Sequence, residues 1–61
     1  MRDSPHDRRR TILRALSPTT VHSVQALSRL TGVSVITIRR DLAELAHEGL
    51  ATRVHGGALR A

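Results

Sequence analysis

The sequence predicts a mainly α fold in which three helices are followed by a small C-terminal β-hairpin. Three stretches carry apolar residues at helical spacing, and each begins beside a serine that can cap a helix. After the third stretch, the spacing changes to the alternation typical of a strand, and a His-Gly-Gly turn interrupts it. Because the chain has only 61 residues, we expect one domain over residues 1–61 with a small core.

Residues 35–48 are predicted to form the helix around which the rest of the chain is organised. At about 100° per residue, its apolar side chains fall within about 60° of one another, which is the stripe of a helix lying on a core. The stripe consists of Ile38, Leu42 and Leu45, with Val35 beside them. Ser34 can cap this helix, and Gly49 suits the left-handed residue that ends many helices. The opposite side should face outward and consists of Ile36, Thr37, Arg40, Glu44 and His47.

Residues 5–17 are predicted to form the first helix. Ser4 can cap it, Pro5 is tolerated at its first position, and Asp7 favours the positive end of the helix dipole. The expected buried stripe consists of Ile12, Leu13 and Leu16. Two roles remain open for the adjacent arginines, a solvated charged face and contact with phosphate; these are Arg8, Arg9 and Arg10.

Residues 24–31 are predicted to form the second helix, which Ser23 caps and Gly32 ends. Its expected buried face consists of Val24, Leu27 and Leu30. The segment before it, residues 21–23, is too short to be more than a minimal strand or an extended connector. A link of only roughly three residues, 31–33, joins this helix to the next. Two short helices with so tight a link, the second of them amphipathic and basic, are the helix-turn-helix arrangement.

Residues 50–60 are predicted to form the hairpin. Leu50, Thr52 and Val54 alternate with their neighbours, and the turn at residues 55–57 contains glycines for which a positive φ costs little. Residues 58–60 can return as the partner strand. Three helices followed by such a hairpin make a winged helix-turn-helix, in which the hairpin is the wing.

The charge of the chain indicates a polyanionic partner. Ten basic residues against five acidic ones give a net charge of +5, and the sequence pI is near 11.8. All ten basic residues are arginine, whose planar guanidinium matches phosphates and guanine edges with two hydrogen bonds. The chain has no Phe, Trp or Tyr, so it lacks the stacking platforms that readers of single strands and most RNA readers use. Double-stranded DNA is therefore the favoured partner.

Other classes of function have little support in the sequence. The absence of cysteine excludes disulfides and thiolate metal sites. Apolar runs never exceed two residues and the N-terminus lacks an apolar signal core, so we expect no membrane span and no secretory signal, and a cytoplasmic location is the default. The four histidines lack ligand spacing, and no concave pocket is expected at this size. We therefore predict neither a metal, nor a cofactor, nor an enzyme.

In a helix-turn-helix, the N-terminal half of the second motif helix enters the major groove and presents its outward side chains to base edges. Arg40 is the candidate for a contact to guanine, and Ile36 for a contact to a thymine methyl, although Ile36 can also be an incidental exposed residue. The complete set of expected major-groove contacts is Ser34, Ile36, Thr37 and Arg40.

The remaining expected contacts involve the DNA backbone. Ser23, at the start of the second helix, can combine capping with a contact to phosphate. The other expected backbone contacts are Arg39 and Arg9, and those from the wing are Arg53, His55, Gly56, Gly57 and Arg60. Asp41 should hold an arginine or a neighbouring helix end rather than touch DNA. Glu44 should restrain Arg40, four residues before it.

Three runs of residues also carry a family resemblance. They are Arg8-x-x-x-Ile12-x-x-x-Leu16, Val33-Ser34-x-x-Thr37-Ile38-Arg39-Arg40-Asp41-Leu42 and Leu50-x-x-Arg53-Val54-His55-Gly56-Gly57-Ala58. With these runs in register, the chain resembles the N-terminal DNA-binding domain of the DeoR-type bacterial transcriptional regulators over residues 8–59. It departs from the commonest family pattern at His22 and Gln25, where acidic residues are frequent.

The resemblance implies the operator-reading domain of a transcriptional repressor, often of an operon for sugar or nucleoside catabolism. It also implies a larger C-terminal domain that binds a phosphorylated sugar and forms homo-oligomers. That domain lies outside these 61 residues, so we expect this chain to hold the DNA reader alone and to be largely monomeric. Two alternatives stay open: a winged helix that docks on an acidic protein, and a general binder of DNA or RNA without a preferred site.

Overall fold

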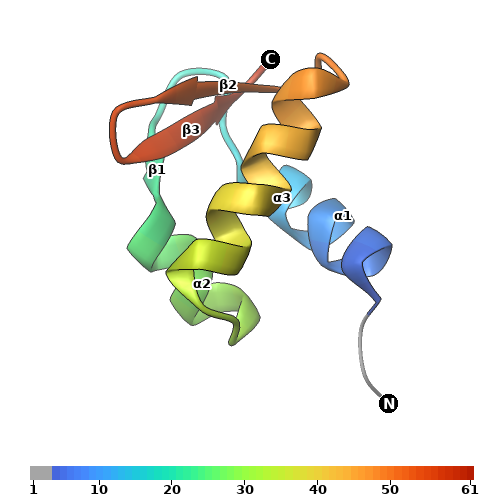
Figure 1. The fold of residues 1–61 in the computed structure, drawn as a ribbon. Helices are drawn as coiled ribbons and strands as arrows, with labels where there is room; N and C mark the ends of the chain where they lie inside the picture. Colours follow the sequence, from blue (N-terminus) through green and yellow to red (C-terminus); the bar gives the residue numbers. More distant parts are fainter. Residues whose placement is uncertain (1–3) are drawn as a thin grey trace.

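The helix predicted over residues 35–48 contacts most of the other helices and strands. The structure is a computed structural model that describes residues 4–61, so the first three residues of the predicted domain lie outside the described residues. In chain order the elements are α1 (Pro5–Ala15), β1 (His22–Ser23), α2 (Val24–Thr31), α3 (Val35–His47), β2 (Ala51–Val54) and β3 (Gly57–Arg60). Figure 1 shows α3 crossing the middle of the molecule, with α1 to its right, α2 below it and the β2–β3 hairpin to its upper left. This is the predicted winged helix-turn-helix.

A serine caps the start of each helix, as predicted. The hydroxyl oxygen of Ser4 accepts a hydrogen bond from the backbone N–H of Asp7 at 3.1 Å, and Ser23 accepts one from Ala26 at 3.0 Å. Ser34 does the same at the start of α3. These bonds satisfy N–H groups that have no partner within the helix, so the sequence fixes each helix start locally.

The helix ends differ slightly from prediction. α1 ends at Ala15 rather than at Ser17, because Leu16 is already extended, and Ser17 precedes a proline that disfavours the helical conformation. α3 ends at His47, one residue before the predicted end. Gly49 has a φ of +76°, the left-handed conformation that was expected of it.

The sheet has three strands rather than the two of a hairpin, in the order β1-β3-β2. β2 and β3 pair antiparallel around a two-residue turn, His55 and Gly56, with Thr52 opposite Leu59. The minimal segment before α2 forms β1, which pairs with the other edge of β3 and sets Ser23 opposite Gly57.

The two wing glycines have different roles, and the expectation that both serve the turn is wrong. Gly56 has a φ of +76°, whereas Gly57 lies within β3 and has no positive φ. Gly57 is buried, and a Cβ at this position would collide with the backbone carbonyl oxygen of His22. Its missing side chain is what allows β1 to pair with β3.

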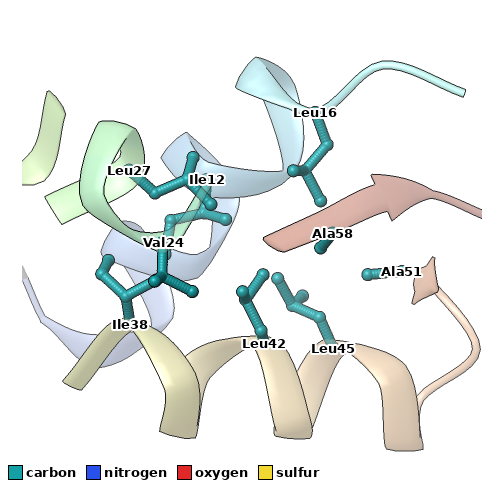
Figure 2. Close-up of a cluster of buried hydrophobic side chains, with 9 residues drawn as sticks. All are labelled: Ile12, Leu16, Val24, Leu27, Ile38, Leu42, Leu45, Ala51 and Ala58. Carbon is teal, nitrogen blue, oxygen red and sulfur yellow. The ribbon is translucent and has the colours of Figure 1, made fainter. Parts of the chain in front are cut away.

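The core gathers side chains from every helix and from the hairpin (Figure 2). α3 contributes the predicted stripe, which points toward α1, α2 and the two alanines of the sheet. The nine buried apolar residues are Ile12, Leu16, Val24, Leu27, Ile38, Leu42, Leu45, Ala51 and Ala58. Leu13 and Val35 are half-buried and pack against this cluster.

The prediction that Leu30 belongs to the core is wrong, because this side chain is 56% exposed. Residues three apart advance by about 300° on a helix, so two such steps place Leu30 about 120° away from Val24. α2 therefore buries Val24 and Leu27 but turns Leu30 toward solvent.

None of the helices within residues 4–61 has the length and the apolar character that a membrane span requires.

Leu27 and Leu30 provide a matched pair for testing this packing. We expect Leu27→Ala to lower the free energy of unfolding by about 2–5 kcal/mol, because Leu27 is 1% exposed and its truncation leaves a cavity. Leu30→Ala should change it by about 0.5 kcal/mol or less. Urea denaturation followed by circular dichroism measures both. Equal losses would contradict the orientation of α2.

Candidate nucleic-acid interface

The outward face of α3 combines an exposed apolar residue with an arginine. Ile36 is 63% exposed and Arg40 is exposed beside it, while Thr37 is half-buried. Both ion pairs found within residues 4–61 involve Asp41, so the predicted pair between Glu44 and Arg40 is absent there. The guanidinium of Arg40 is therefore available to a ligand.

Two hydroxyl groups lie together at the start of α3. The Ser34 oxygen accepts from the backbone N–H of Thr37 at 3.2 Å and lies 3.1 Å from the Thr37 hydroxyl oxygen. Only one of the two hydroxyls can donate within this pair, so the proton of the other remains free. The first turn thus holds a donor beside Ile36, in a position fixed by the helix cap.

A groove lies between the start of α2, the middle of α3 and the tip of the hairpin. We call it the wing groove; its volume is about 380 Å³, and it is open to solvent. It forms because the tip of the hairpin lies beside the start of α2 and the middle of α3, although no concave pocket was expected in a chain of this size. Its lining residues are Val24, Gln25, Arg39, Leu42, Arg53, Val54, His55, Gly56 and Gly57.

The wing groove unites residues that the sequence assigned separately to a helix and to a hairpin. Arg39 comes from α3, whereas Arg53 and His55 come from the wing, and all three are exposed. Guanidinium groups bind phosphate oxygens with two parallel hydrogen bonds. Gln25 was missed by the sequence reasoning; its place two residues after the cap of α2, next to a predicted phosphate contact, is the signal that could have found it.

Two other residues predicted to contact the DNA backbone do not line this groove: Ser23 lies at its edge, and Arg60 lies away from it. Ser23 is half-buried and caps α2 immediately before the groove residues Val24 and Gln25. Arg60 lies at the opposite end of β3 from the turn, roughly 10 Å along the strand from Gly57. Its backbone N–H donates to the carbonyl oxygen of Ser17 at 2.9 Å, so it lies at the base of the wing.

Asp41 forms the polar connection between α3 and α1. It is 1% exposed, and its carboxylate accepts hydrogen bonds from Nε and Nη2 of Arg8 and from Nε of Arg9. The prediction that Asp41 holds an arginine is confirmed. For Arg8 the expectation of a solvated charged face is wrong, because its side chain is only 16% exposed and is bound to Asp41.

The charge state of Arg8 is secured by this contact. The hydrogen bonds to Asp41 raise the pKa of Arg8 above its ordinary value; burial opposes the shift, and the negative charge of Asp41 adds to it. Arg8 therefore stays positively charged beside the carboxyl group of Asp41.

Comparison with known proteins identifies the family. The DeoR-like helix-turn-helix domain matches residues 8–61. The chain is 47% identical over 55 residues to the HTH-type transcriptional regulator GlpR of Haloferax volcanii, covering 90% of this chain and 22% of that protein. It is 40% identical over 55 residues to the HTH-type transcriptional regulator GolR of Listeria innocua, again covering 90% and 22%. The HTH-type transcriptional repressor CsqR of Escherichia coli is 49% identical over 39 residues, covering 64% and 15%.

These relatives are named as regulators or repressors of transcription and not as enzymes. The chain spans about a fifth of the length of GlpR and of GolR, and no solved structure gives a significant match. Because the family match covers most of α1, all of α2 and α3, and the wing, this chain belongs to the DeoR-like helix-turn-helix domains, a non-enzymatic class of DNA-binding transcription regulators.

Proposed function

We propose that this chain is the operator-reading domain of a transcriptional repressor and binds a preferred sequence of double-stranded DNA through α3. The observation that carries the proposal is the exposed pair of Ile36 and Arg40, which the fold turns away from the core. A guanidinium can donate two hydrogen bonds to O6 and N7 of guanine, and an apolar side chain fits the methyl group of thymine. Both features are displayed in the major groove.

The first turn of α3 adds two hydroxyl groups to the surface that we propose contacts the bases. Ser34 and Thr37 are coupled to each other, and the free proton of the pair can be donated to a base acceptor or a phosphate. Because the cap fixes these hydroxyls, they restrict the angle at which α3 enters the groove.

The wing groove binds the phosphates of one strand in this proposal. Arg39, Arg53 and His55 supply donors from two elements, and Gly56 allows the turn to approach the backbone closely. Ser23 and Gln25 add contacts at the start of α2, where backbone N–H groups favour an anion. Gly57 contributes through the sheet rather than by touching phosphate, and Arg60 extends the basic rim toward the base of the wing.

The proposal extends to the intact protein through its relatives, which are about four times as long as this chain. We propose a cytoplasmic repressor of a catabolic operon, with a C-terminal domain that binds a sugar-phosphate effector and forms homo-oligomers. A single domain is expected to bind weakly, and pairing on repeated half-sites raises the affinity through effective concentration.

Selection of random duplex DNA tests the proposed function. At near-physiological salt we expect the wild-type chain to enrich a short motif, and Arg40→Ala to lose the preference at one guanine, equivalent to about 1–3 kcal/mol. Arg14→Ala is the matched control, because it removes the same charge from an exposed position on α1. Binding without a motif would favour a general nucleic-acid binder, and no binding at low salt would favour docking on an acidic protein.

The salt dependence of binding tests the wing groove separately. Arg53→Ala should reduce the steepness of log K against log [salt] by about 0.9, the contribution of one phosphate contact, and should leave the enriched motif unchanged. Arg39→Ala should behave in the same way. Fluorescence anisotropy titrations at several salt concentrations measure the slope. A slope equal to that of the wild-type chain would remove these arginines from the interface.

A further inference from the structure

We infer that Asp41 is a positioning residue for DNA binding, which holds Arg9 ready for a phosphate on the side of α3 opposite the wing groove. The inference rests on the proposed function. It adds a second contact to the DNA backbone, made by an arginine that Asp41 holds in place. It also assigns different roles to Arg8 and Arg9, which are adjacent in the sequence and bind the same carboxylate.

Asp41 acts through the arginines and not by touching DNA. With 1% exposure it is out of reach of a ligand, and both of its oxygens accept hydrogen bonds from guanidinium groups. A carboxylate at the surface of α3 would repel phosphate, whereas this one is buried and outnumbered by two positive charges. The cluster therefore presents a net positive charge to its surroundings.

The two arginines are held in different ways. Arg8 uses Nε and Nη2 on Asp41 and is 16% exposed, so its guanidinium is committed to the protein. Arg9 uses only Nε, at 3.1 Å, and is 32% exposed. Among the described residues its Nη groups have no hydrogen-bond acceptor, so four of its five N–H donors are free. Arg8 thus balances the charge of Asp41, and Arg9 remains available to a second anion.

The position of Arg9 fits the far strand of the major groove. On α3, Asp41 lies about 160° from Arg39, so the side that meets α1 is opposite the side that lines the wing groove. Figure 1 shows the same arrangement, with α1 and the wing on opposite sides of α3. A helix fills most of the width of a major groove and has a phosphate strand along each side. With Arg40 directed at the bases, Arg9 and the wing groove can each reach one strand.

Asp41 also removes a cost of binding. A free arginine side chain has several rotatable bonds and loses entropy when it is fixed on a phosphate. The hydrogen bond from Nε to Asp41 orients the guanidinium plane before DNA arrives, so part of that entropy is already lost in the folded protein. The contribution of Arg9 to the affinity for DNA therefore depends on Asp41, and Asp41 affects that affinity only through Arg9.

A double-mutant cycle tests this dependence. Arg9→Ala, Asp41→Asn and the double variant are titrated with a fluorescent duplex that carries the motif enriched by the wild-type chain, and the folded fraction of each is measured by circular dichroism. We expect Arg9→Ala to lower affinity about tenfold and to reduce the salt slope by about 0.9. Asp41→Asn should weaken binding in the wild-type background but have no further effect in the Arg9→Ala background. Arg14→Ala is the control for charge alone.

A different result is expected if Asp41 only holds α1 against α3. In that case Asp41→Asn would weaken binding equally in both backgrounds, in proportion to the loss of folded protein, and this outcome would overturn the inference. Should Asp41→Asn fail to fold, Arg9→Lys decides the question. This variant keeps the charge but replaces the oriented guanidinium with a single ammonium group. If Asp41 positions Arg9, the loss of affinity should be close to that of Arg9→Ala. Wild-type affinity would overturn the inference.

The proposed function and the inference fail in distinguishable ways. Absence of duplex binding by the wild-type chain at low salt would overturn both. Sequence-selective binding by the wild-type chain, together with an unchanged salt slope in Arg9→Ala, would overturn the inference alone.

Discussion

Burial of the apolar stripe of α3 is the interaction on which the rest of the structure depends. Ile38, Leu42 and Leu45 belong to the same buried cluster as side chains from the other helices and from the sheet, so this one helix packs against α1, α2 and β2 at once. A helix that buries one side must expose the other. The outward positions of Ile36 and Arg40 are therefore a geometric consequence of the core.

The wing is positioned by a constraint of a different kind. β1 has only two residues, yet it pairs with β3 and makes the hairpin part of a three-stranded sheet. This pairing requires Gly57, because any side chain there would meet the carbonyl oxygen of His22. This pairing attaches the hairpin to the segment before α2, and the wing turn and Arg39 line the same basic groove.

The arginines of this chain differ in environment although they are identical in the sequence. Arg8 is largely buried and neutralises Asp41, Arg9 is shared between the protein and solvent, and Arg40 is exposed. A net charge of +5 describes the attraction to a polyanion but not which arginine meets it. The buried carboxylate makes that distinction, because it removes one guanidinium from the surface and restrains a second.

Features that depend on neighbours along the chain could be predicted from the sequence. Helix starts follow from serine hydroxyls that bond an N–H three residues later, the stripe of α3 follows from helical periodicity, and the end of α3 follows from Gly49. The sequence predicted the winged helix-turn-helix fold, its family and the exposure of Ile36 and Arg40 for the same reason. Each depends on spacing within one element or on a run of adjacent residues.

Features that join distant segments depend on how the helices and strands pack against one another, which residue spacing does not reveal. The exposure of Leu30 depends on where the neighbouring elements lie, because they cover Val24 and Leu27 and leave in solvent a side chain about 120° from Val24. The partner of β1, the role of Gly57 and the meeting of Arg39 with Arg53 all depend on how the hairpin docks. Asp41 was expected to hold an arginine, but its partners lie 32 and 33 residues away, and no periodicity extends across that distance. Docking of α1 on α3 selects Arg8 and Arg9, because packing brings their guanidinium groups to a carboxylate that cannot remain buried without them.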